Sequence, residues 1–105
     1  MKFVNLTPHA LTVEGMGVIP ASGTIARVSV NSTDISSVGG VRLRAQLKGQ
    51  VTGLPAAVGG TTYVVSGMVL DALGSNRRAD VVAPDTGPDA IRENGQIVAV
   101  RGFIC

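Results

Sequence analysis

The hydrophobic and polar positions of this chain alternate with a period of two in its clearest stretch. From residue 41 to residue 48 every second residue is apolar and the residues between are polar, which is typical of a half-buried β-strand. This strand is expected to continue through Gly49 to Val51, and the polar Arg42 and Arg44 are expected on its solvent face. A similar alternation over residues 25–30 predicts a second strand, and the β-branched run at residues 61–65 predicts a buried one.

Shorter apolar runs predict further strands. Residues 2–6 read as a strand, with residues 11–14 as its antiparallel partner across a turn that contains Pro8. Residues 18–19 form a short apolar run, and residues 31–40, rich in Ser, Thr, Asp and Gly, are expected to form a loop. The dipeptide Asn94-Gly95 predicts a hairpin that joins a strand near residues 89–92 to one within residues 96–103.

One helix is expected, over residues 66–74. Ser66 can cap its first turn, an apolar stripe follows, and Gly74 stands where a left-handed terminator belongs. So short a helix needs to pack on a sheet. The sequence therefore predicts a mainly β (α+β) fold: one compact domain over residues 1–105, built as a mostly antiparallel sheet or small barrel of about six to seven short strands with one short helix.

Composition sharpens this picture. The 105 residues suit one domain, and with 45% hydrophobic residues but only 3% aromatic ones the core must be built from Val, Ile, Leu and Ala. The net charge is +2, and the basic residues are dispersed with few aromatics between them. Binding to nucleic acid is therefore not expected, and no apolar run approaches a membrane span. Cys105, the single cysteine, allows no internal disulfide, which fits a reducing compartment.

The motifs of common enzymes are matched only in fragments. Asp85-Thr86-Gly87 resembles the signature of retroviral-type aspartic proteases, but here it lies late in the chain, between Pro84 and Pro88. The Gly-Gly-Thr-Thr run at residues 59–62 lacks the lysine of a phosphate-binding P-loop. His9 and the aspartates have no established metal-ligand spacing. We therefore expect no catalytic residues, no metal and no cofactor, although an enzyme is not ruled out.

A set of polar and aromatic residues near strand ends forms the candidate ligand site. The bias toward arginine, with seven arginines to two lysines, favours recognition of phosphate by the planar guanidinium group. Tyr63 is the stacking candidate, and the hydroxyl, amide, carboxylate and imidazole groups suit a sugar or a base. The predicted ligand-binding residues are Asn5, Thr7, His9, Arg27, Tyr63, Ser66, Arg77, Arg78, Asp80, Asp85 and Thr86. The alternative is that each of them only satisfies local backbone groups or forms a surface ion pair.

Five segments spread over nearly the whole chain form a specific combination: FVNLTPHALTV (residues 3–13), IPASGTIARV (19–28), GLPAAVGGTTYVVSGMV (53–69), DVVAPDTGP (80–88) and GQIVAVRGF (95–103). In these segments the chain resembles a family of small proteins encoded in bacteriophages and prophages. The resemblance implies a phage-derived protein in a bacterial cytoplasm, and it transfers no catalytic residue.

Three functional hypotheses follow. The first is an anti-defence protein that sequesters a phosphorylated nucleotide immune signal, of the cyclic nucleotide or cyclic ADP-ribose type, without turning it over. The first alternative is a virion-assembly or host-protein-interaction module, in which the same polar segment is a docking epitope. The second alternative is a hydrolase of such a signal. A homo-oligomer is expected under the first hypothesis, because one small core rarely encloses a deep pocket and protomers can share one.

Overall fold

The computed structural model describes residues 2–105, without the side chains of residues 30–31 and 46–48. The chain is mainly β, as predicted, and the described residues close into no barrel. Its elements are β1 (Lys2–Asn5), β2 (Leu11–Val13), β3 (Gly17–Ile19), β4 (Arg27–Val38), β5 (Val41–Thr52), β6 (Thr61–Val64), α1 (Gly67–Leu73), the 3-10 turn η1 (Gly74–Asn76), β7 (Val81–Pro84), β8 (Ile91–Glu93), β9 (Gln96–Ala99) and β10 (Phe103–Ile104).

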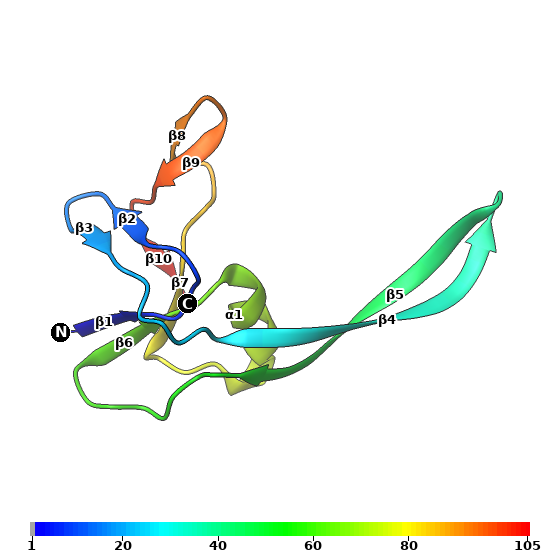
Figure 1. The fold of residues 1–105 in the computed structure, drawn as a ribbon, viewed down its shortest axis with the longest axis horizontal. Coiled ribbons are helices and arrows are strands. Elements are labelled where there is room, and N and C mark those ends of the chain that lie inside the picture. Colours follow the sequence, from blue (N-terminus) through cyan, green and yellow to red (C-terminus); the bar gives the residue numbers. More distant parts are fainter. Residues whose placement is uncertain (1) are drawn as a thin grey trace.

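A four-stranded sheet in the order β1-β6-β7-β10 forms the centre of the body (Figure 1). Strand β6 runs parallel to both β1 and β7, while β10 runs antiparallel to β7. Parallel neighbours cannot be joined by a tight turn, and helix α1 supplies the crossover from β6 to β7. The rings of Phe3 and Phe103, from the two edge strands, stack with their centroids 5.4 Å apart.

The core lies between this sheet and α1. Its buried aliphatic residues come from β6, β7, the helix and several connecting segments, and Tyr63 is the buried aromatic residue. The main cluster contains Leu6, Ala26, Tyr63, Val65, Val69, Leu70, Val81 and Ala83. Val28 and Val51, at the base of the β4–β5 hairpin, pack against it. The core was predicted to consist of Val, Ile, Leu and Ala; Val, Leu and Ala are confirmed, whereas no isoleucine is among the buried core residues of the described chain.

Three two-stranded antiparallel hairpins, β2–β3, β4–β5 and β8–β9, complete the fold. The turn of the last one is the predicted Asn94-Gly95, whose φ values of 52° and 79° belong to the type I′ turn that matches strand twist. The predicted helix is also confirmed, because Ser66 Oγ accepts a hydrogen bond from Val69 N at 3.3 Å. No helix in the described part of the chain is long and apolar enough to cross a membrane.

The β4–β5 hairpin extends far beyond the body, as Figure 1 shows. Each strand has 12 residues, and Gly39 and Gly40, with φ of 56° and 81°, form the type I′ turn at its tip. We call residues 29–50, beyond the core contacts of Val28 and Val51, the arm. Because of the arm the radius of gyration is 16.3 Å, whereas a compact chain of this length has about 13 Å.

Three expectations about the strands were wrong. Residues 31–40 are not a loop: residues 31–38 continue β4, and the Gly39-Gly40 turn leads into β5. Polar residues on both faces of β4 hide its period, since this part of the strand is exposed. The short strand at residues 11–13 pairs with β3 instead of β1, whose parallel neighbour is β6. The total of ten strands among the described residues also exceeds the predicted six to seven.

Gly53, at the end of β5, holds a position that other residues cannot occupy without strain. Its φ is +81°, and an added Cβ would overlap the carbonyl oxygen of Ile25 and lie 3.2 Å from the carbonyl carbon. Gly60 has a similar φ of +77° but open space around it. We therefore expect Gly53→Ala to lower the free energy of unfolding by about 3 kcal/mol and Gly60→Ala by only about 1 kcal/mol. Urea denaturation of both variants measures the difference, and equal losses would contradict the predicted overlap.

Candidate functional site

Arg78, one of the predicted site residues, binds an aspartate two residues away. Its Nε and Nη2 donate to Asp80 Oδ1 and Oδ2 at 2.9 and 2.6 Å, and its Nη1 donates to the carbonyl oxygen of Pro55 at 3.0 Å. The two carboxylate bonds form the planar bidentate pair that guanidinium geometry favours. The guanidinium group therefore holds the loop at residues 53–60 against the start of β7.

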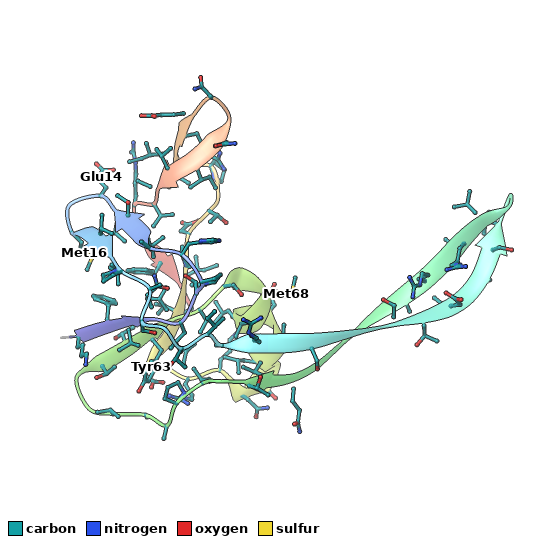
Figure 2. The ribbon with its side chains drawn as sticks, viewed as in Figure 1. Glu14, Met16, Tyr63 and Met68 are labelled. Atoms are coloured by element: carbon teal, nitrogen blue, oxygen red, sulfur yellow. The ribbon has the colours of Figure 1, made fainter. Side chains whose placement is uncertain are left out.

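Tyr63 lies next to the Arg78–Asp80 pair. Its side chain is buried in the body (Figure 2), its hydroxyl donates to the carbonyl oxygen of Ala56 at 3.1 Å, and Arg78 Cζ lies 5.9 Å from its ring centroid. The hydrogen bonds from Arg78 hold the pKa of Asp80 below its ordinary value, against the opposing effect of burial. The hydrogen bond to Asp80 likewise raises the pKa of Arg78. The structure thus brings three predicted residues together, but their polar groups bind one another and the backbone.

Asn5 organises the turn that follows β1. It is fully buried, its Nδ2 donates to the carbonyl oxygens of His9 and Ile19 at 2.8 and 3.2 Å, and its Oδ1 accepts from Thr7 N and Thr7 Oγ1 at 2.9 and 2.6 Å. Both hydrogens and both lone pairs of the amide are therefore used. The amide fixes the chain direction at residues 5–9, and the exposed His9 takes part through its backbone carbonyl alone.

The remaining predicted residues are separate from these two clusters. Arg77 contacts Asp71 at 3.5 Å and the Cys105 carbonyl at 3.2 Å. Asp85 Oδ1 accepts from Gly87 N at 3.0 Å, the local turn bond expected of an aspartate. The Thr86 carbonyl accepts from Arg92 at 3.1 Å.

Ser66 caps α1, as described above. Arg27 begins β4, where its backbone pairs with that of Thr52. Most of the eleven residues thus take part in local structure, and the contacts between them form no common site.

An open pocket of about 500 Å³ lies between α1 and β5. Its lining consists of Gly49, Gln50, Val51, Ala72, Leu73 and Asn76. None of these belongs to the predicted site. A signal for the pocket is absent from the sequence, because it arises only where the base of the arm passes the end of the helix. The amides of Gln50 and Asn76 provide its polar side-chain groups.

The sequence did not predict a function for the outer part of the arm, which we define as residues 32–45 and call the outer arm. Residues 32–44 are all exposed, and the exposed fractions of Ile35, Val38, Val41 and Leu43 are 66%, 63%, 66% and 43%. Apolar side chains gathered on a projecting element are characteristic of interaction surfaces. The signal available in the sequence was the Gly39-Gly40 turn between residues 31–38 and the strongly alternating residues 41–48.

Comparisons with known proteins add no assignment to this geometry. The chain matches no protein-family model, no curated protein and no solved structure. Within the described residues 2–105, no three His, Cys, Asp or Glu side chains are grouped so that they could hold a metal ion.

The bond between Arg78 and Asp80 predicts a pH dependence of stability. Because the pKa of Asp80 is lower in the folded chain than in the unfolded chain, its carboxylate stabilises the fold above about pH 4, the ordinary aspartate pKa. This stabilisation is lost as the pH falls through the lower, folded-state pKa. We expect Asp80→Asn to be less stable than the parent at pH 7, and the difference to shrink below pH 4. Thermal unfolding between pH 2 and 7 measures it, with the exposed Asp89→Asn as control. A pH-independent difference would contradict the assignment.

Proposed function

We propose that this protein is a non-catalytic docking module that binds a partner protein through the β4–β5 arm. The observation that carries the proposal is the exposure of both faces of a long two-stranded ribbon, apolar residues included. A two-stranded hairpin without a packing partner is marginally stable in water. A partner that covers the outer arm would supply the apolar contacts that the body does not reach.

The hydrogen bonds made by polar residues of the body support the same proposal. Arg78, Asp80 and Asn5 are used in bonds that hold loops and turns of the body, whereas the apolar side chains at the tip of the arm contribute nothing to the core cluster. In the bacteriophage setting that the sequence resemblance implies, the partner would be a virion component or a host protein.

Photo-crosslinking from the arm tests the docking module. We expect p-benzoylphenylalanine in place of Ile35 to give a covalent adduct in cells of the natural host. The same group in place of Met68, exposed on α1 in the body (Figure 2), is the control and is expected to give little or none. Mass spectrometry identifies what is attached. Adducts from neither position, or an equal yield from both, would contradict docking through the arm.

A trimmed chain shows whether the arm serves the fold or the partner. In this variant residues 31–47 are replaced by Asn-Gly, which joins the paired Val30 and Lys48 through a type I′ turn. Because the core cluster contains no residue of the outer arm, we expect a cooperative unfolding transition within about 5 °C of the parent. A body that fails to fold would show that the arm serves the fold instead.

Sequestration of a phosphorylated nucleotide signal is the second candidate, and the pocket between α1 and β5 favours it. Its volume of about 500 Å³ falls within the range of small-molecule sites. Gln50 and Asn76 offer amides for a base edge, and Arg77 follows Asn76 in the chain with a side chain 44% exposed. This pocket, unlike the polar segment that the sequence singled out, could accept a cyclic nucleotide or cyclic ADP-ribose.

Calorimetry with a panel of cyclic nucleotides and cyclic ADP-ribose isomers tests this candidate. We expect Arg77→Ala to weaken the binding of a true ligand about tenfold or more, because a charged phosphate contact is lost, and Arg101→Ala to leave it unchanged. Recovery of intact ligand after denaturation identifies a sponge, whereas reaction products on chromatography identify a hydrolase. Folded protein that gives no heat with any member of the panel would contradict both.

A further inference from the structure

The two faces of the outer arm differ sharply in charge. Side chains alternate between the faces along each strand, and residues directly paired across an antiparallel ribbon share a face. The pairs Val38–Val41, Ser36–Leu43 and Thr33–Ala45 therefore lie on one face, and the pairs Ser37–Arg42 and Asp34–Arg44 lie on the opposite face. We call the first the neutral face, because none of its six residues is ionisable.

The opposite face carries all the ionised groups of the outer arm. Asp34 Oδ1 lies 3.2 Å from Arg44 Nε and 4.0 Å from Arg42 Nε. Two guanidinium groups thus share one carboxylate, and this face keeps a net positive charge. If two copies met through it, like charges would oppose each other.

We propose that the neutral face is covered by the same face of a second copy of this chain. A face without charge can meet its own copy with no electrostatic penalty, and its Val38, Val41 and Leu43 are apolar residues that gain from leaving water. A partner recognised by charge complementarity would instead be drawn to the arginine-bearing face. The contact is isologous, so each residue of the neutral face meets the neutral face of the partner about a two-fold axis.

The width of the ribbon limits the size of this dimer interface. The ribbon is only two strands wide, so the interface falls at the small end of specific contacts, below about 1,200 Å² of total buried surface. A dissociation constant in the micromolar range is therefore expected. The charged faces of both arms remain turned outward in the dimer.

This inference rests on the proposed docking function and is narrower than it. If the arm crosslinks in cells only to a different protein and the pure chain is monomeric, the docking function stands and the second copy is wrong. If the arm crosslinks to nothing and the pure chain is monomeric, both the docking function and the second copy are wrong.

Sedimentation velocity of the full chain between about 1 and 200 µM tests the dimer. The parent is expected to pass from monomer to dimer over this range. Val41→Asp and Val38→Asp, on the neutral face, are expected to raise the dissociation constant at least tenfold. Ser37→Asp adds the same charge to the opposite face and is expected to leave the constant within about threefold.

Far-UV circular dichroism establishes that each of these variants is folded, and the high exposure of Val38 and Val41 makes that the expected result. A parent that stays monomeric at 200 µM overturns the proposal. Dimerisation that survives both neutral-face variants, or that Ser37→Asp weakens equally, overturns it as well.

Discussion

The parallel pairing of β6 with a neighbour on each side is the constraint on which the body depends. Its backbone is bonded to β1 and to β7, and Tyr63 and Val64 are buried. A strand enclosed in this way cannot use a tight turn to reach its parallel neighbour, so a crossover is required. Helix α1 provides the crossover and covers the core at the same time. The base of the arm then packs on that core through Val28 and Val51.

This arrangement gives the molecule two parts. In the body, polar side chains such as Asn5 and Arg78 are hydrogen-bonded within the fold. In the outer arm, the apolar side chains do not pack on the core. Asn5, Asp80 and Arg78 stabilise turns and loops that the sheet alone would leave undefined. Side-chain bonds of this kind specify one chain path in a small domain with few large residues. The outer arm makes no comparable contact with the body. Its apolar side chains are therefore the part of the surface whose composition the fold itself does not explain.

The sequence predicted those parts of the fold that depend on local chemistry. The cap at Ser66, the turn at Asn94-Gly95 and the β-branched residues 61–65 act through near neighbours, and the structure confirms each one. The pairing of β1 with β6 joins residues some sixty positions apart, and no local signal encodes it. Residues 31–38 form a strand because they pair with β5, not because they pack on a hydrophobic core. Their hydrophobic pattern therefore did not predict a strand.

The candidate site was harder to predict for a related reason. Polar residues near strand ends, such as Asn5 and Asp85, can bind a ligand or satisfy the backbone, and the sequence pattern is the same in both cases. Only the geometry distinguishes them, and it assigns Asn5 and Arg78 to the backbone and to near neighbours. The pocket and the neutral face arise from contacts and register between separate segments. Neither could be read from a single stretch of sequence.

The form of the arm also separates two ways in which it could meet a partner. An unpaired strand edge can add a further strand, and natural proteins block this with bulges and charged residues. Both devices are present here: the register shifts between Val28 and Val30 and between Asp34 and Ser36, and Arg42, Arg44 and Asp34 line the ribbon. The neutral face carries no charged residue, and its outermost pairs, Val38–Val41 and Ser36–Leu43, lie on the tip side of the second register shift. Register shifts and charged residues thus disfavour the addition of a strand to the arm. Its uncharged face is suited to packing face to face.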